Sequence, residues 1–194
     1  MFNYCSNKIC KILLDNKQIE EDELELYKYG FFLLLSNIFF TILIIVLGLL
    51  FGNIFETLIF YISFCTIRHF AGGYHANTEI RCDIITTLFF TVSVFLISLS
   101  EQRNIKIIVL FLSALSVVTI SVLSPLDTPA KPLDSDEKKK YRRISLIILS
   151  VIVVLIIISY IFKIKYTLIP CCISLILEAV LLLAGKIKGQ IVKT

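Results

Sequence analysis

Long apolar runs separated by short polar stretches dominate the chain. Five runs reach, or nearly reach, the length needed to cross a bilayer, because a helix rises about 1.5 Å per residue and the hydrocarbon core is about 30 Å thick. They cover residues 31–51, 84–100, 105–124, 144–162 and 166–185. A sixth run, 54–67, is shorter and carries Glu56. The pattern predicts an all-α, polytopic membrane bundle of about six transmembrane helices, of which the second is short.

Polar segments flank this expected membrane domain, which covers residues 31–185. Residues 1–30 are charged and contain loosely spaced apolar positions, which favours an N-terminal amphipathic helix lying on the membrane surface. A solvated helix without a special role is an equally good reading of that spacing. The first apolar run begins too late, and lacks the small-residue cleavage site, for a signal peptide. We therefore expect it to stay in the mature protein, followed at the other end by a polar tail, 186–194.

The distribution of positive charge predicts the orientation. The 194 residues include 19 Lys and Arg, and the net charge is +4. If all six runs cross the membrane, fifteen of these cations lie on one side and four on the other. If the short segment 54–67 instead turns back without crossing, the division is eleven against eight. Because Lys and Arg collect on the cytoplasmic side, we expect six crossings with both termini in the cytoplasm of a cell-membrane protein. The polar loops 68–83 and 125–143 then share that side, and topology explains the basic charge without a nucleic-acid partner.

The loop 68–83, RHFAGGYHANTEIRCD, contains the residue types needed for nucleophilic catalysis. A cysteine nucleophile needs a base or a cation to form its thiolate, and His75 and Cys82 are the candidates. On one continuous helix their seven-residue separation would place them about 10.5 Å apart along the axis, too far for contact. The backbone must therefore bend, or the site must close on substrate. Gly72 and Gly73 supply a hinge, because glycine accepts dihedral angles that other residues avoid.

The residues after the hinge predict a second helix. Asn77 or Thr78 would cap it, leaving Cys82 in its first or second turn, where the helix dipole favours an anion and the amide groups can hold an oxyanion. Residue types alone leave another interpretation open, in which His75 is a loop residue beside the headgroups and Cys82 a small residue at a helix end. His69 is a second possible base. The other cysteines read as cytoplasmic thiols or packing residues, without the paired spacing of a zinc site.

Two stretches together resemble a known family. RHFAGGYHANTEIRCD is similar to the signature of the accessory gene regulator B (AgrB) family of integral membrane cysteine endopeptidases, with an Arg, a Gly-Gly-x-His block and a Cys seven residues after the His. SPLDTPAKPLDSDEKKKYRR, 124–143, resembles the family's second landmark, a cytoplasmic loop containing Pro and Lys before the fifth span. The resemblance implies that His75 and Cys82 are the catalytic pair and that the protein is a homodimer. We expect no cofactor and no metal.

The same resemblance implies the substrate and the reaction. The enzyme would remove the C-terminal tail of an AgrD-like precursor through a thioester and promote its cyclisation to a thiolactone autoinducing peptide for quorum sensing. The supporting and substrate-binding candidates are Arg68, Gly72, Gly73, Arg81, Lys131, Lys138, Lys139, Lys140, Arg142 and Arg143. Arg68 and Arg81 also fit a simple role at the cytoplasmic interface, and attraction to anionic lipid explains the cations of 138–143 equally well.

Three questions stay open at the level of sequence. The group that would orient His75 is not evident, and Asp83, Asn77, Glu79 and Asp127 are all possible. A small peptide exporter is the main alternative function, although within the spans only Glu56 and Glu178 are ionisable, whereas ion-coupled carriers usually need intramembrane charges. A structural membrane partner of another enzyme is a third reading.

Overall fold

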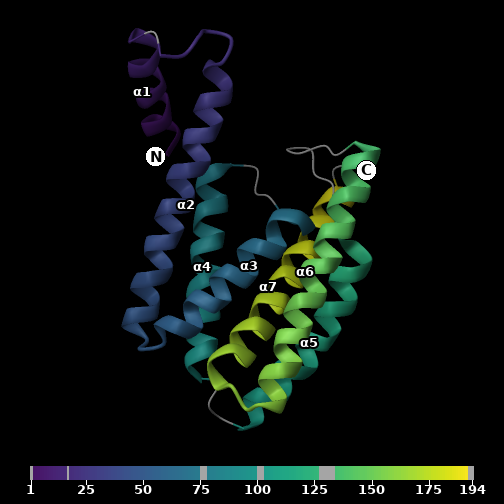
Figure 1. Cartoon of the computed structure of the whole chain (residues 1–194). Coiled ribbons are helices and arrows are strands. Elements are labelled where there is room, and N and C mark those ends of the chain that lie inside the picture. The colour runs from purple at the N-terminus through teal and green to yellow at the C-terminus, as the bar shows by residue number, and fades with distance from the viewer. Residues whose placement is uncertain (1, 17, 75–77, 100–102, 127–133, 192–194) are drawn as a thin grey trace. The chain divides into compact units, whose positions relative to one another are not determined.

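The computed structural model describes residues 2–16, 18–74, 78–99, 103–126 and 134–191 (Figure 1). Within these residues the chain forms seven helices: α1 (Phe2–Asp15), α2 (Leu24–Leu50), α3 (Ile54–Ala71), α4 (Glu79–Leu99), α5 (Arg103–Leu123), α6 (Ser135–Ile161) and α7 (Lys165–Ile191). Six of them, α2 to α7, are long and apolar enough to cross a membrane. The expected all-α, polytopic membrane fold is confirmed, and the second span is the shortest, with 18 residues.

Several helix boundaries differ from the expectation. The expected loop 68–83 is helical at both ends, because α3 continues to Ala71 and α4 begins at Glu79, and α7 continues to Ile191, into the expected tail. α2 begins at Leu24, within the polar N-terminal segment, and α6 begins at Ser135, before its apolar run. The start of α6 follows from a capping interaction, because the Glu137 carboxylate accepts a hydrogen bond from the Asp134 backbone N–H at 3.3 Å. Residues 125–143 are therefore not one loop, and the cations from Lys138 to Arg143 lie on the first turns of a helix.

The chain divides into two compact units, and the first covers residues 1–44. Here the Phe2 ring of α1 packs against Phe32 and Phe39 of α2, with centroids 6.4 and 5.5 Å apart. Cys10 is buried, and this burial raises the pKa of its thiol.

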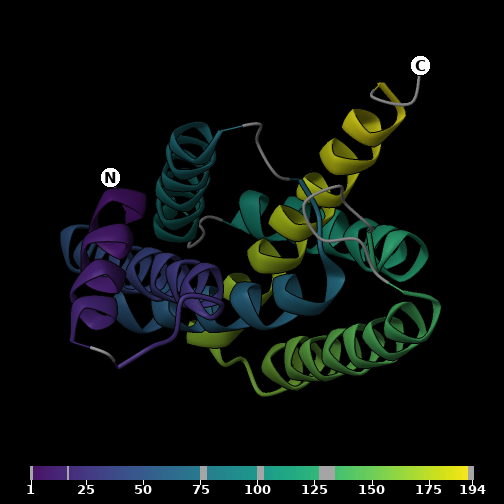
Figure 2. The same cartoon turned by 90° about the horizontal axis from the view of Figure 1, so that it is seen from above.

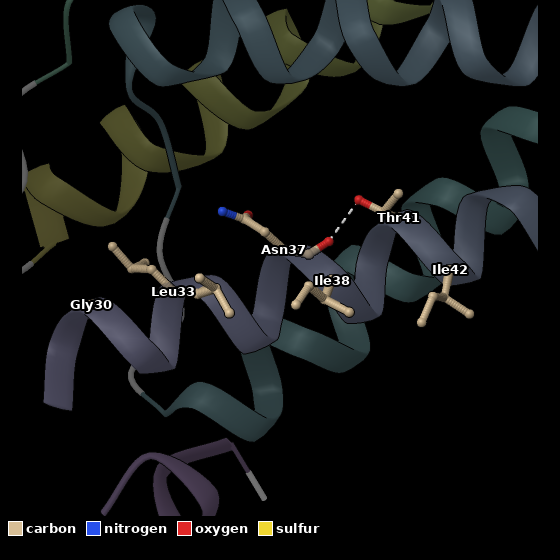
Figure 3. Close-up of a pocket in the computed structure, with 7 residues that line it drawn as sticks. Gly30, Leu33, Asn37, Ile38, Thr41 and Ile42 are labelled. Carbon is tan, nitrogen blue, oxygen red and sulfur yellow. Dashed lines mark hydrogen bonds between the residues drawn. The ribbon is translucent and has the colours of Figure 1, made fainter. Parts of the chain in front are cut away.

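A shallow hollow of about 520 Å³ lies along the first part of α2. It is lined by Gly30, Leu33, Leu34, Asn37, Ile38, Thr41 and Ile42 (Figure 3). The Thr41 hydroxyl donates a hydrogen bond to the Asn37 carbonyl at 2.8 Å, so α2 itself satisfies this polar group.

The second unit covers residues 45–194 and is built around α7. Figure 2 shows α7, in yellow, running between α3, α5 and α6. The buried residues that join these four helices are Ile67, Ala71, Ile120, Leu149, Ile152, Cys171, Leu175, Ala179 and Leu182. The centre of the unit is therefore α7, an apolar helix that its neighbours enclose.

Aromatic rings join α4 to α3. Phe90 of α4 lies edge-on to Phe60, Tyr61 and Phe64 of α3, with centroids 5.5 to 5.9 Å apart. Such edge-to-face pairs have the preferred geometry for aromatic contacts. The rings tie the helix that carries Cys82 to the helix that ends just before Gly72.

Candidate active site

The backbone bends at Gly72 and Gly73, the predicted hinge between the helix that ends at Ala71 and the helix that carries Cys82. α3 ends at Ala71, and the next two residues, Gly72 and Gly73, have φ angles of 76° and 135°. Residues with a Cβ rarely adopt such angles, which explains the glycine pair. A new helix, α4, begins at Glu79 and carries Cys82, whereas His75 lies outside the described residues.

Cys82 lies in the first turn of α4. Its backbone N–H donates to the Thr78 carbonyl at 3.1 Å, which marks Thr78 as the residue at the start of the helix. The thiol is free and its residue partly exposed, whereas Cys10, Cys171 and Cys172 are buried. The predicted position of Cys82 near a helix N-terminus is thus confirmed.

Several of the other candidates lie outside the described residues. His75, Asn77, Asp127 and Lys131 are among them, and the side chain of Glu79 is not described either. Asp83, next to Cys82 in α4, is partly buried, while Arg81 is exposed. The roles of His75 and of a third group stay predictions.

Arg68 holds the segment that leads into the motif's histidine. Its Nη1 donates to the Gly72 carbonyl at 2.6 Å and its Nη2 to the Tyr74 carbonyl at 2.7 Å. Nη1 also lies 3.8 Å from the Glu178 Oε2 atom of α7. Arg68 therefore does more than mark a membrane interface, because its guanidinium fixes two carbonyls on either side of Gly73.

Tyr74, the residue before His75, is fixed at three points. Its N–H donates to the Leu181 carbonyl of α7 at 2.9 Å, its carbonyl accepts from Arg68, and Lys188 Nζ lies 5.1 Å from the centroid of its ring. The chain is therefore bound to α7 immediately before the histidine. Sequence reasoning missed this residue, because nothing in the local pattern links 74 to 181.

Glycine makes this close approach possible. A Cβ on Gly185 of α7 would lie 2.9 Å from the Tyr74 nitrogen and 3.0 Å from the Gly73 carbonyl carbon. A Cβ on Gly73 would collide with the Arg68 guanidinium, and one on Gly72 would lie 2.6 Å from the Leu126 carbonyl oxygen. Segment 72–74 therefore fits between α7 and Leu126 only because three glycines are present.

The connection that follows α5 meets the same segment. The Leu126 N–H donates to the Ala71 carbonyl at 2.9 Å, and Gly72 and Leu126 form an isolated parallel bridge. The starts of the two polar stretches 68–83 and 125–143 therefore lie side by side, as expected for loops on one side of a membrane.

The cations of 138–143 differ in their surroundings. Arg142 Nη1 donates to the Ser124 carbonyl at 3.0 Å, and the Ser124 and Ser145 hydroxyls are 2.5 Å apart, so this part of α6 is tied to the end of α5. Lys139 pairs with Asp136 of its own helix at 3.3 Å. Lys138, Lys140 and Arg143 are exposed. Arg142 thus has a structural contact that does not require a substrate.

The described side chains offer no cluster of three or more His, Cys, Asp or Glu that could hold a metal ion. The chemical groups described in this part of the chain are the Cys82 thiol at the start of α4 and, before residue 75, a glycine-rich segment bonded to α7.

The chain matches a known protein family over most of its length. The model of the family described as Accessory gene regulator B matches residues 6–183, nearly the whole chain. The chain belongs to the AgrB family. This membership supports its involvement in autoinducer processing by an accessory gene regulator system.

Curated members of the AgrB family are moderately similar to this chain. The accessory gene regulator protein B of Staphylococcus carnosus is 32% identical over 136 residues, which are 70% of this chain and 69% of that protein. A putative AgrB-like protein of Lactiplantibacillus plantarum is 29% identical, covering 76% and 73% of the two chains. One of Clostridium perfringens is 25% identical, covering 72% and 68%. No solved structure matches.

Proposed function

We propose that the chain is a membrane-embedded cysteine endopeptidase that cleaves and cyclises an AgrD-like precursor. The observation that carries the proposal is the position of Cys82 in an AgrB-family chain: a partly exposed thiol in the first turn of α4, after a bend whose first residues are fixed on α7. A helix N-terminus favours an anion and offers unpaired amide groups to a tetrahedral oxyanion.

In the proposed first step, the Cys82 thiolate attacks a peptide carbonyl carbon of the precursor. The C–N bond breaks as the C–S bond forms, and His75 gives its proton to the leaving amine. The C-terminal tail leaves, and the rest of the precursor remains on Cys82 as a thioester.

In the second step, a cysteine thiol inside the precursor attacks this thioester. Its proton passes to His75, the new C–S bond closes the ring, and Cys82 leaves as the thiolate. Exchanging one thioester for another is nearly neutral in bond energy, so an intramolecular attack with high effective molarity can outrun hydrolysis where water is scarce. The product is a cyclic thiolactone peptide.

The surroundings of the site fit an acidic precursor tail. Lys138, Lys140 and Arg143 are exposed on the first turns of α6, which follows the connection bonded to segment 71–72. In this proposal they attract the tail, the active site and both termini face the cytoplasm, and the enzyme works in the cell membrane as a homodimer.

The decisive experiment uses the full chain in lipid vesicles with a synthetic precursor. Intact-mass analysis should detect a thioester on Cys82, and Cys82→Ala should abolish tail release, while Cys65→Ala, which removes a thiol within the α3 span, should leave it unchanged. Tail release by Cys82→Ala at the wild-type rate would overturn the proposal. Transport of uncut precursor by Cys82→Ser vesicles would favour an exporter instead.

A further inference from the structure

Glu178 is a buried acid within the last membrane span. It has no exposed surface, and neither carboxylate oxygen has a hydrogen-bond partner among the described residues. Carboxyl groups inside membrane spans are energetically expensive, so they are usually kept for a function and paired with a cation. The cation here is Arg68 of α3, with Nη1 3.8 Å from Oε2.

Arg68 joins this acid to the segment before the motif's histidine. The nitrogen that faces Glu178 also donates to the Gly72 carbonyl, and the second terminal nitrogen donates to the Tyr74 carbonyl. Carbonyl dipoles accept these hydrogen bonds but cannot neutralise a guanidinium that always carries its charge. Among the described residues, Glu178 is the acid within ion-pair distance of that guanidinium, and as a carboxylate it would supply the counter-charge that keeps Arg68 turned toward α7.

A role in packing alone does not explain an acid at this place. Replacing a buried ion pair by apolar side chains of similar volume is often neutral or stabilising, whereas removing one partner leaves an uncompensated charge. What the acid adds is a defined position for Arg68, and through Arg68 a defined path for segment 72–74.

Building on the proposed function, we infer that Glu178 is a positioning residue of the peptidase, which acts through Arg68 to fix segment 72–74 on α7. Glu178 does not touch the substrate. Its effect falls on the rate of the chemical step, because segment 72–74 leads directly into His75.

The first test measures kcat and KM for tail release by the full chain in vesicles. Glu178→Gln keeps the shape but removes the charge, and we expect kcat to fall at least about tenfold, since misplacing a catalytic group by 1 Å can cost about 100-fold. KM should change less than about twofold, because Glu178 does not bind the precursor. The matched control is Ser174→Ala, one turn earlier in α7, where the buried hydroxyl bonds to the Cys171 carbonyl of its own helix.

A double-mutant cycle tests whether the effect passes through Arg68. Residues that act through one another are not additive, so Arg68→Gln combined with Glu178→Gln should be no slower than Arg68→Gln alone, within about twofold. Wild-type kcat in Glu178→Gln, or losses that multiply in the double variant, would overturn the inference.

Hydrogen exchange separates this inference from the proposed function. The Tyr74 amide, bonded to the Leu181 carbonyl, should exchange at least about tenfold faster in Glu178→Gln and Arg68→Gln than in Ser174→Ala, because freeing Arg68 releases the segment. Unchanged exchange in Glu178→Gln would overturn the inference even if activity falls. If Cys82→Ala keeps wild-type tail release, the proposed function fails, and exchange at Tyr74 alone decides whether Glu178 fixes the segment.

Discussion

The helices α6 and α7 have the same length, 27 residues, yet very different surroundings. In the most apolar part of α6, 22% of the residues are buried inside the protein, and in α7 the share is 67%. The span of α6 is the more apolar of the two, so hydropathy alone would place α6 at the centre. In a membrane, lipid tails are as apolar as leucine, so being apolar does not drive a helix into the protein.

Side-chain size explains the difference better than hydropathy. Between large buried residues such as Leu175 and Leu182, the enclosed side of α7 carries small ones, Cys171, Cys172, Ser174, Ala179 and Gly185. At Gly185 the backbone of residues 73 and 74 approaches closely. In contrast, α6 presents large aliphatic side chains outward, among them Ile147, Val151 and Val154. Segment 72–74, which leads into the candidate site, therefore packs on α7, where Gly185 leaves room for another backbone.

The largest expected effect compares truncations in the two helices. Leu182→Ala removes a fully buried side chain of α7 and should lower the free energy of unfolding by about 3 kcal/mol, the usual cost of a core cavity. Ile157→Ala in α6, where the side chain is 51% exposed, should cost about 0.5 kcal/mol. Unfolding in mixed detergent micelles measures both, and equal losses would refute the contrast between the helices.

A smaller effect tests the close approach on α7. Gly185→Ala should destabilise the protein by about 2 kcal/mol, because the new Cβ would meet the Gly73 and Tyr74 backbone. In Gly30→Ala of α2, where a Cβ has no neighbour within 4 Å, better helix propensity should instead stabilise by up to about 1 kcal/mol. Thermal unfolding shows whether each variant is more or less stable than the wild type. Unchanged stability in Gly185→Ala would mean that segment 72–74 does not need this close contact.

The smallest expected effect concerns the start of α6, where side chains of α6 contact Ser124. Ser145→Ala removes the hydroxyl that contacts Ser124 and should cost about 1 kcal/mol. Ser150→Ala is the control, because that exposed hydroxyl bonds to the Leu146 carbonyl of its own helix, and it should change stability by less than about 0.5 kcal/mol. Detergent unfolding compares the two, and an equal effect would show that the contact with Ser124 adds nothing.

Sequence reasoning predicted the spans well and the site in part. Apolar run lengths predicted five spans and the charge bias predicted the sixth, while helix geometry together with Gly72 and Gly73 predicted the bend before Cys82. The early start of α6 was missed, because hydropathy predicts a loop for this charged stretch. The capping interaction of Asp134 and Glu137 extends the helix into it. Glu178 was noticed only as a rare intramembrane acid. An acid within a span indicates that a cation lies nearby. The sequence position of Glu178 does not show that this cation is Arg68.

The sequence by itself determined the membrane class, the number of spans and the pairing of His75 with Cys82 as candidates, because these depend on run length, charge bias and local spacing. Only the tertiary structure decided that α7 is central, that Arg68 joins Glu178 to segment 72–74, and that Leu126 pairs with that segment. These contacts join residues far apart in the chain, and in lipid every face of a span is apolar, so hydropathy carries no information about which face meets which helix.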